Sequence, residues 1–500
     1  MAAIENDRTA TRRLSAGYGR VVVGLLLAAY TFNFIDRTIL ATIGQAIKVD
    51  LKLTDTQLGL LGGLAFAILY TVLGVPIARL AERWNRVSII SIAVIIWSGF
   101  TVACGFAGSF AMLLATRVGV GIGEAGCSPP SHSLISDYFE PKKRASALSV
   151  YAFGIPLGAL IGAVAGGWLA QHLGWRAAFM IVGAPGILLA ILIKLMVREP
   201  ARGQSEPGEI HHAPATLSLK SELAEMAAVT RALFGSWPML NMMLGVTLVS
   251  FAGYGTGQFS APYFNRAFGL DYATVGLIFG LTGGFSAGVG TLAGGFISDF
   301  ASARDARWYA LVPAIGLIIA TPLYVAGYLQ SDWRIAALVL LAPGAFAYTY
   351  LAPTFAVVQN VVETRRRATA AAIMLLFLNI IALGGGPLFT GWAIDALGQF
   401  HFTHPDSHSF LGAIAGAFGG DHSGASFVAH CPGGLAPTGS QALLGARCKA
   451  VEALATRQGI LITIAFYALG ALHYLLASFG LASRLEREKA AWLSPAASQG

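Results

Sequence analysis

Long apolar runs alternate with short polar segments along almost the whole chain. A helix needs about 20 predominantly apolar residues to cross the hydrocarbon core of a bilayer. Twelve segments meet this criterion, at 18–45, 56–79, 87–108, 110–138, 145–171, 175–197, 238–264, 273–299, 308–330, 333–361, 367–395 and 458–483. Most connections are short, which is typical of antiparallel neighbours, and two are long, at 198–236 and 396–457. The pattern therefore predicts an all-α membrane protein with twelve transmembrane helices.

The composition excludes several other classes of protein. Hydrophobic residues make up 55% of the chain and charged residues 12%, and the mean hydropathy is +0.66, which does not describe a soluble surface. The net charge is +8, but the basic residues stand singly between apolar runs, which argues against a nucleic-acid partner. His132 and His473 lie on different helices without an evident nucleophile or metal partner. We therefore expect no enzyme, no metal site and no cofactor.

The positions of lysine and arginine predict the orientation. Most of the 33 lie in the N-terminal tail, the C-terminal tail and the alternate loops that share their side of the membrane. By the positive-inside rule both termini are cytoplasmic. The first twenty residues lack the apolar core of a cleavable signal, so we expect an integral protein of a bacterial-type inner membrane. Cys431 and Cys448 then lie outside, either as a disulfide or as two unpaired thiols.

An internal repeat divides the chain into two halves. The segment LTDTQLGLLGG from Leu53 aligns with LDYATVGLIFG from Leu270, and Gly167-Trp168 aligns with Gly391-Trp392. Six helices have therefore been duplicated in one orientation. The predicted organisation is a cytoplasmic tail 1–17, a six-helix bundle 18–197, a cytoplasmic linker 198–236, a second bundle 237–483 that includes the outer loop 396–457, and a cytoplasmic tail 484–500. Spaced apolar residues from Leu217 to Leu233 predict an amphipathic helix in the linker, and the alternative is a tether that only joins the two halves.

Four charged residues lie deep inside the predicted spans: Asp36, Arg37, Arg117 and Glu124. Such residues are costly in a bilayer and normally face a protein or water-filled interior. At 1.5 Å per residue, Asp36 and Arg117 lie about 13 Å and about 10 Å from the same end of their helices, so we expect them to pair. The pair could serve transport or act only as a clamp between two helices. An arginine here could bind an anion, while a carboxylate at low dielectric could carry a proton.

Several motifs resemble those of the major facilitator superfamily. Ala78 to Arg86 resembles its signature between the second and third helices, and Gly295 to Asp299 repeats part of it. Arg117 to Ala125 is similar to its fourth-helix motif. The resemblance implies two pseudo-symmetric six-helix bundles with the substrate path between them. It also implies gating roles at the inner surface for Glu82, Arg83, Arg86 and Asp299.

Within that superfamily the chain resembles the spinster group. The resemblance rests on Asn33 to Arg37, on Gly123-Glu-Ala125, and on the stretch from Pro353 through Gln359 to Ala368. It implies a monomeric, alternating-access, proton-coupled transporter of an anionic single-chain lipid such as a lysophospholipid or a sphingosine phosphate. A small organic anion or an amphiphilic drug is the alternative substrate. The residues expected to carry the function are Asp36 and Glu124 for proton coupling, and Arg37, Arg117, Asn33, Tyr254 and Gln258 for substrate binding.

Overall fold

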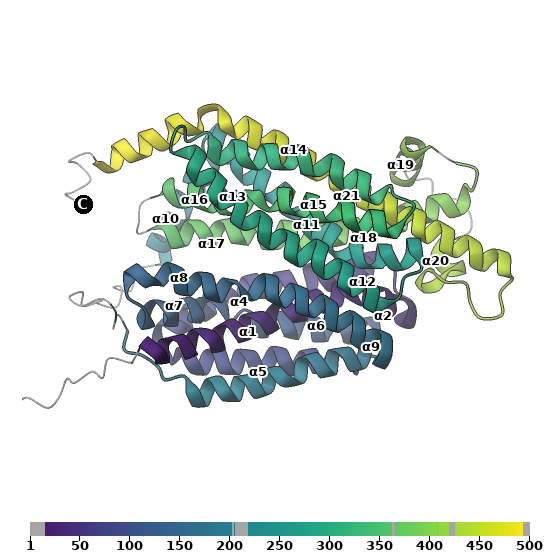
Figure 1. Cartoon of the computed structure of the whole chain (residues 1–500), viewed down its shortest axis with the longest axis horizontal. Coiled ribbons are helices and arrows are strands. Elements are labelled where there is room, and N and C mark those ends of the chain that lie inside the picture. Colours follow the sequence, from purple (N-terminus) through teal and green to yellow (C-terminus); the bar gives the residue numbers. More distant parts are fainter. Residues whose placement is uncertain are drawn as a thin grey trace, which may run out of the picture.

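The fold is helical throughout the part of the chain that the computed structural model describes, which is residues 16–202, 205, 219–362, 366–407, 409–419 and 426–493. Two bundles lie side by side, and each has its own apolar core (Figure 1). The first bundle consists of α1 (Ala16–Thr42), α2 (Gly44–Leu51), α3 (Asp55–Gly62), α4 (Leu64–Arg83), α5 (Arg86–Cys104), α6 (Phe110–Glu124), α7 (Ser128–Tyr138), α8 (Pro141–Ala152) and α9 (Gly154–Met196).

The second bundle follows the linker helix α10 (Leu219–Phe234). It consists of α11 (Trp237–Phe268), α12 (Tyr272–Phe279), α13 (Ser286–Ser302), α14 (Trp308–Tyr328), α15 (Trp333–Ala347), α16 (Leu351–Asn360), α17 (Arg367–Phe377), α18 (Gly385–Thr403), α19 (Phe410–Phe418), α20 (Phe427–His430) and α21 (Ala442–Leu493). A π-helical turn joins α12 to α13 at Gly280–Phe285, and another joins α17 to α18 at Leu378–Gly384. Many spans are therefore built from two consecutive helices.

The twelve predicted spans are confirmed. In the described residues, eleven helices are long and apolar enough to cross a membrane. One of them, Ser146–Met196, has 51 residues and contains Gly174 at φ 83°, a left-handed backbone conformation that favours glycine. The chain turns back at this glycine, so this helix supplies two spans and the total is twelve.

The breaks within the helices repeat along with the sequence. The break at Gly63 between α3 and α4 aligns with the π-helical turn that begins at Gly280. The break at Phe153 between α8 and α9 aligns with the start of the π-helical turn Leu378–Gly384. Turns of this kind are frequent at functional sites. Duplication has therefore preserved local backbone irregularities as well as helices.

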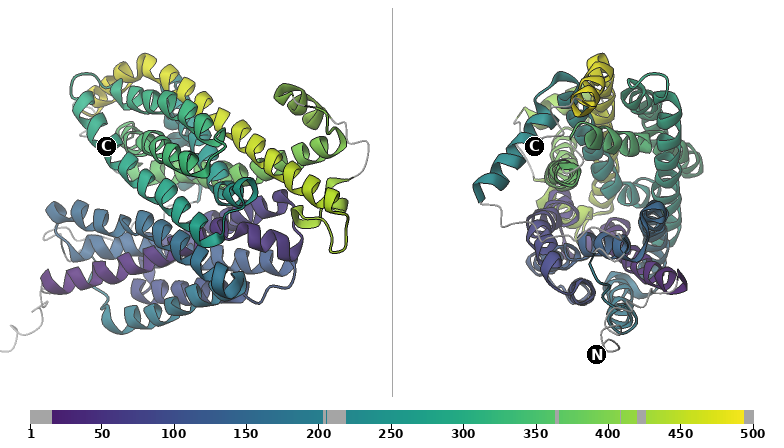
Figure 2. Two further views of the ribbon diagram at one scale, coloured as in Figure 1. Left: turned by 45° about the vertical axis from the view of Figure 1, so that its right-hand side comes forward. Right: turned by 90° about the vertical axis from the view of Figure 1, so that its left-hand side faces the viewer.

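The two ends of the molecule differ. At one end lie α2, α19 and α20, and we call it the α20 end; the opposite end, with α8, α10, α17 and the C-terminus, we call the termini end (Figure 1). The bundles meet mainly through α3 against α18 and α9 against α12. Figure 2 shows these contacts toward the α20 end, with the bundles diverging toward the other.

The predicted start of the last helix is wrong. We expected a loop at 396–457 and a helix from 458, but α18 continues to Thr403 and α21 begins at Ala442. The first turns of α21 carry Arg447, Lys449 and Glu452, so their sequence is polar. Glu452 is buried and pairs with Lys48 and Arg266, so contacts with other helices stabilise these turns in place of an apolar face. The predicted tail from 484 is also helical as far as Leu493.

The linker contains the expected helix, α10. Val229 and Leu233 are buried against the second bundle, whereas Met226 is 47% exposed. Leu217 lies outside the described residues. The linker helix is thus attached to the second bundle through its C-terminal half.

Candidate functional site

Helices α1 and α6 bring the four predicted charges together inside the first bundle. Asp36 is 2% exposed, and Arg117 and Glu124 are each 1% exposed. Of the four, Arg37 is the most accessible, with 21% of its side chain exposed. We call these four residues, Asp36, Arg37, Arg117 and Glu124, the central cluster. Arg37 is the member of the cluster that a ligand can reach.

The ion pair in this cluster joins Arg37 to Glu124. Arg37 Nε donates to Glu124 Oε2 at 2.8 Å, and Arg37 Nη2 lies 2.7 Å from the same oxygen. Glu124 Oε1 is buried and has no hydrogen-bond partner among the described residues. A buried carboxylate oxygen without a donor is costly, so this atom is suited to receive a proton.

The predicted ion pair between Asp36 and Arg117 is wrong. Arg117 Nη1 contacts the backbone oxygen of Asp36 at 3.5 Å, and Arg117 Nε has no partner in the described structure. The Asp36 carboxylate instead accepts a hydrogen bond from Thr101 Oγ1 on α5 at 2.9 Å. Asp36 and Arg117 do lie at the same depth, as predicted, but the side chain of Asp36 points to α5.

Aromatic rings surround the guanidinium of Arg37. Its Cζ lies 5.2 Å from the ring centre of Phe34, 4.5 Å from that of Phe66 and 4.8 Å from that of Tyr70. Rings at such distances attract a cation electrostatically. Asn33, which is 2% exposed, lies beside Glu124. The guanidinium is therefore held in one place even when its carboxylate partner is neutral, and it remains available to an anion.

Two predicted residues of the second bundle differ in accessibility. Tyr254 on α11 is 42% exposed and lies within electrostatic range of Arg37 and Tyr70. Gln258, one turn further along α11, is 6% exposed, and its Nε2 has no partner in the described structure. Gln258 packs against Gly62, where an added Cβ would lie 2.1 Å from Gln258 Oε1. Tyr254 can meet a ligand, whereas Gln258 belongs to the contact between the bundles.

A pocket opens beside Tyr254 in the second bundle. Its wall combines aromatic rings with small residues: Gly253, Thr256, Gly257, Ser260, Phe264, Phe279, Thr282, Gly283, Tyr324, Tyr328, Leu340, Tyr348 and Tyr467. The hydroxyls of Ser260 and Tyr328 bond each other at 2.6 Å, and the rings of Tyr324 and Tyr467 stack at 5.2 Å. Partnered hydroxyls present little free polarity, so this wall suits an apolar or aromatic group.

Of the four predicted gating residues, Arg86 is buried and forms two ion pairs. It is 1% exposed and binds Asp137 at 2.5 Å and Glu199 at 2.6 Å, which joins the start of α5 to the ends of α7 and α9. Glu82, Arg83 and Asp299 are exposed at the termini end. Arg86 therefore holds the first bundle together at that end.

A second set of buried charges was missed from the sequence. Lys48, Asp55, Arg266 and Glu452 lie together at the α20 end, and Asp395 lies next to them. Four of these five residues stand near the ends of apolar runs, and Glu452 lies in the polar stretch before the last run; charges are common in both places, so none was notable alone. For Asp395, the signal that could have found it is the repeat, because Asp395 aligns with the uncharged Gln171.

Among the described residues, no group of three or more His, Cys, Asp or Glu side chains could hold a metal ion. The two free cysteines, Cys104 and Cys127, are both buried in the first bundle, as expected for small apolar residues. The central cluster consists of side chains that carry charge and can exchange protons.

Comparison with known proteins identifies the relatives of this chain. The model of the Major Facilitator Superfamily matches residues 26–387. An "MFS-type efflux pump" of Mycolicibacterium smegmatis is 33% identical over 79% of this chain and 89% of its own length. "Protein spinster homolog 1" of Bos taurus is 29% identical over 77% of this chain and 74% of its own.

A solved structure is similar over nearly the whole chain. It is a bacterial homologue of the human lysosomal transporter spinster, in an inward-facing and unoccupied conformation. It is 34% identical, with a TM-score of 0.78 over 95% of this chain and 99% of that one. The spinster-like resemblance inferred from the motifs is therefore confirmed.

Proposed function

This chain belongs to the Major Facilitator Superfamily, and from that premise we propose that it carries an anionic single-chain lipid, of lysophospholipid or sphingosine phosphate type, and that this transport is coupled to protons. That it is a membrane transporter follows from the family and from its relatives. The substrate and the proton are the proposed part. The observation that carries the proposal is the partly exposed Arg37, whose guanidinium is bound to a single oxygen of a buried glutamate.

The headgroup site in this proposal is Arg37. A guanidinium can bind two oxygens of a phosphate at once, and the interaction gains strength away from bulk water. Phe34, Phe66 and Tyr70 hold the guanidinium in position, and Tyr254 adds a hydroxyl from the opposite bundle. Arg117 is too deeply buried to contact a ligand, so its part is to balance the charge of Asp36 and Glu124.

The proton carriers in this proposal are Glu124 and Asp36. When a proton binds Glu124 Oε1, the carboxyl group becomes neutral and its attraction for Arg37 falls. Arg37 is then free to bind the anionic headgroup. When the proton leaves, the carboxylate recovers Arg37 and the headgroup is released. Asp36 Oδ1 is likewise buried without a partner in the described structure and provides a second position for a proton.

The lipid chain in this proposal enters the pocket beside Tyr254. The pocket begins at Gly253 and Gly257 on α11, on either side of the residue that lies near Arg37. A ligand with its phosphate at Arg37 would then place its chain against Tyr324, Tyr348 and Tyr467. An anionic group and an apolar group would thus be bound by different halves of the protein, which is the arrangement an amphiphile requires.

The proposed orientation places both termini in the cytoplasm of a bacterial-type inner membrane, with a monomer as the functional unit. Support comes from the basic residues at the termini end and from the inward-facing state of the similar solved structure. In that orientation the bundles are closed toward the outside and the central cluster is reached from the cytoplasm.

The experiment is uptake into liposomes that contain the purified protein. Lysophospholipid and sphingosine phosphate are offered with and without an imposed pH gradient, to the wild type, Glu124→Gln, Asp36→Asn and Arg37→Ala. We expect Arg37→Ala to lose uptake by more than about tenfold and the two carboxylate variants to lose its dependence on the gradient. The matched control is Asp305→Asn, at a partly exposed position between α13 and α14. Normal gradient-driven uptake by both carboxylate variants would refute proton coupling through this cluster.

A small organic anion or an amphiphilic drug is the second candidate substrate. It is favoured by the similarity to an efflux pump and by the fact that Arg37 would also bind a carboxylate. A long-chain lipid needs the pocket beside Tyr254 for its chain, whereas a small anion does not. If the chain pocket is used, Tyr348→Ala weakens competition by long-chain phosphates and leaves competition by short-chain phosphates unchanged. Equal loss for both chain lengths would favour the small anion.

A further inference from the structure

Two contacts between the bundles at the α20 end have the same backbone geometry. In the first, α3 lies against α18: a Cβ on Gly391 would lie 2.1 Å from Asp55 O, and a Cβ on Gly59 2.2 Å from Pro387 O. We call this the first seam. In the second, α12 lies against α9: a Cβ on Gly167 would lie 2.2 Å from Tyr272 O, and a Cβ on Gly276 2.4 Å from Ala163 O. We call this the second seam.

The repeat relates the two seams residue by residue. Gly59 aligns with Gly276, and Gly391 aligns with Gly167. Backbones this close leave room for no side chain, because even a methyl group would overlap a carbonyl oxygen. Both seams are therefore specific contacts that close completely or open, and their equivalence indicates that they act together.

A side chain of one bundle also covers a helix N-terminus of the other in each seam. In the first, the carboxylate of Asp395 accepts from the backbone nitrogens of Asp55 at 2.9 Å and Thr56 at 2.7 Å, and from Thr56 Oγ1 at 2.6 Å. In the second, Gln171 Oε1 accepts from the backbone nitrogen of Tyr272 at 3.0 Å. A carboxylate at a helix N-terminus is stabilised by the unpaired N–H groups and by the helix dipole.

A buried ion network adjoins the first seam. Lys48 Nζ on α2 lies 2.7 Å from Asp55 Oδ2 and 2.7 Å from Glu452 Oε1 on α21. Arg266 on α11 binds Asp55 Oδ1 through Nη2 at 2.7 Å, and its Nε lies 3.3 Å from Glu452 Oε1. All four side chains are at most 4% exposed. Because Lys48 and Asp55 belong to one bundle and Arg266 and Glu452 to the other, separation of the bundles would break the Lys48–Glu452 and Arg266–Asp55 pairs.

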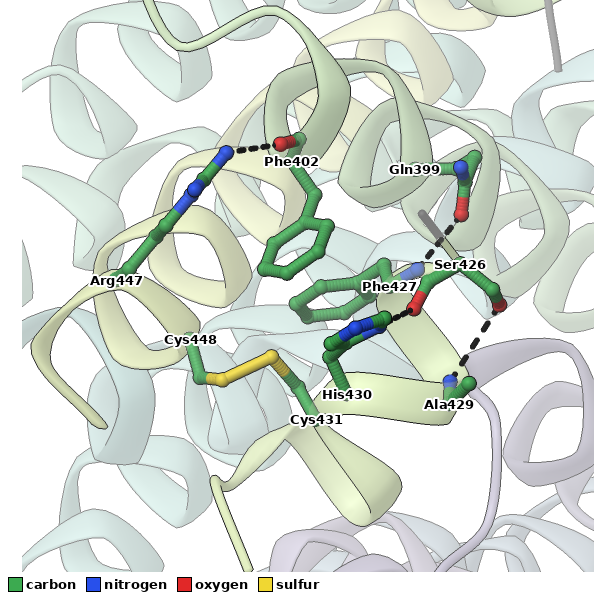
Figure 3. Close-up of a disulfide and its surroundings, with 9 residues drawn as sticks. All are labelled: Gln399, Phe402, Ser426, Phe427, Ala429, His430, Cys431, Arg447 and Cys448. Carbon is green, nitrogen blue, oxygen red and sulfur yellow. Dashed lines mark hydrogen bonds between the residues drawn. A yellow bond between two sulfur atoms is a disulfide. The ribbon is translucent and has the colours of Figure 1, made fainter. Parts of the chain in front are cut away.

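A disulfide positions the segment that supplies Glu452. Cys431 and Cys448 are bonded, which joins the residues after α20 to the first turns of α21 (Figure 3). Phe402 packs against Phe427, and Arg447 donates to the backbone oxygen of Phe402. Beside the disulfide, a Cβ on Gly433 would lie 3.0 Å from Lys48 O, and one on Gly434 2.0 Å from Glu452 Oε2. The bonded segment thus touches both ends of the Lys48–Glu452 ion pair.

We propose that the disulfide-bonded segment 427–452 is a gating element: it presents Glu452 to Lys48 and Arg266 and so locks the two seams shut at the α20 end. The breaks at Gly63 and Phe153 and the π-helical turns that begin at Gly280 and Leu378 all lie at the ends of the seam helices α3, α9, α12 and α18. These are the points at which the seam helices bend when the gate opens. Glu452, Asp395 and the disulfide are positioning groups for transport and do not contact the substrate.

The test reads the opening of the seam directly. Leu58 on α3 is fully buried and packs with residues of the second bundle, so Leu58→Cys reports access to the first seam. The reporter is placed in a chain with Cys104→Ala and Cys127→Ala and labelled in liposomes with a membrane-impermeant maleimide. We expect Glu452→Gln and the pair Cys431→Ser/Cys448→Ser each to raise the labelling rate by at least about fivefold. Asp305→Asn, which removes an exposed ion pair at the termini end, should leave the rate unchanged.

The outcomes separate the parts of the proposal. Unchanged labelling in both test variants, with normal elution of the purified protein, would overturn the gate. Faster labelling in Glu452→Gln alone would overturn the role of the disulfide. Labelling requires no substrate, so failure of the lipid proposal leaves this result intact, and failure of the gate leaves the uptake experiment intact.

Discussion

The two seams share one backbone design and differ in the chemistry of their side chains. In the first, Asp395 is held by three hydrogen bonds and stands next to the buried pairs of Lys48 and Arg266. In the second, a neutral amide of Gln171 makes one bond at an exposed position. The glycines that let the backbones touch are present in both. Duplication has thus preserved the shape of the contact, while divergence has concentrated charge in one copy.

The difference indicates how opening at this end can be controlled. Neutral backbone contact resists separation modestly, because lipid or water can replace much of it. Buried ion pairs resist more strongly, because opening breaks the two pairs that join the bundles, Lys48–Glu452 and Arg266–Asp55. A transporter with one charged and one neutral seam can close through both and be regulated through one.

The largest expected effect comes from the ion network. Lys48→Met leaves Asp55 and Glu452 buried with Arg266 as the remaining nearby cation. Breaking a buried pair costs about 3–5 kcal/mol, whereas an exposed pair contributes about 0–1 kcal/mol. We expect a clearly lowered Tm in detergent for Lys48→Met and little change for Arg176→Met, whose pair with Asp50 is 41% and 44% exposed. Equal Tm values for the two variants would remove the argument that burial distinguishes them.

The next effect tests what the seams have in common. Gly391→Leu and Gly167→Leu each place a side chain against a carbonyl oxygen of the facing helix. Overpacking of this kind costs about 1–3 kcal/mol or more, so both variants should fail to close and lose transport by more than about tenfold. Gly99→Leu on α5, where nothing lies within 4 Å of an added Cβ and which does not line the pocket, is the control for helix tolerance. A strong loss in only one seam variant would show that the two contacts are not equivalent.

The third effect tests what separates the seams. Asp395→Ala removes charge-assisted bonds worth about 1.5–3 kcal/mol, and Gln171→Ala removes a neutral bond worth about 0.5–1.5 kcal/mol. Hydrogen exchange should therefore accelerate by at least about tenfold at the amides of Asp55 and Thr56 in the first variant, and much less at Tyr272 in the second. Similar acceleration in both would mean that the charge of Asp395 adds nothing.

The smallest effect concerns the cap of α12. Asp271 accepts from the backbone nitrogen of Thr274, and this bond holds the pKa of Asp271 below its usual value. Asp271→Ala should cost about 1 kcal/mol at neutral pH. Because the folded-state pKa is lowered, the stabilisation is present above the ordinary pKa and disappears as the pH falls through the lowered one. The Tm difference between wild type and variant should shrink in acid; a constant difference would assign the effect to helix propensity.

The sequence predicted the features that depend on pattern. Twelve spans, the duplicated halves and the burial of Asp36, Arg117 and Glu124 all follow from apolar length and from the cost of charge in a membrane. The partners of these charges did not follow. Arg37 pairs with Glu124 instead of Arg117 with Asp36, because a pair depends on side-chain direction and on a third helix that carries Thr101.

The features that depend on tertiary contact could not be predicted. The first turns of α21 have no apolar run. They are nevertheless helical, and their Glu452 pairs with Lys48 and Arg266 on other helices. The buried network also lies at helix ends, where a charge costs little unless another bundle covers it. The repeat held the missing information, since it aligns Asp395 with Gln171, but only the structure places either residue against a helix N-terminus.

The central claim is that the protein alternates between states closed at opposite ends, with the seams holding the α20 end shut. The most direct measurement uses pairs of spin labels on exposed residues of the two bundles: Phe106 with Leu443 at the α20 end, and Trp84 with Phe300 at the termini end. In Asp395→Ala we predict a longer distance for the first pair and a shorter one for the second, relative to the unsubstituted chain. Two unchanged distances, or two that lengthen together, would contradict the account.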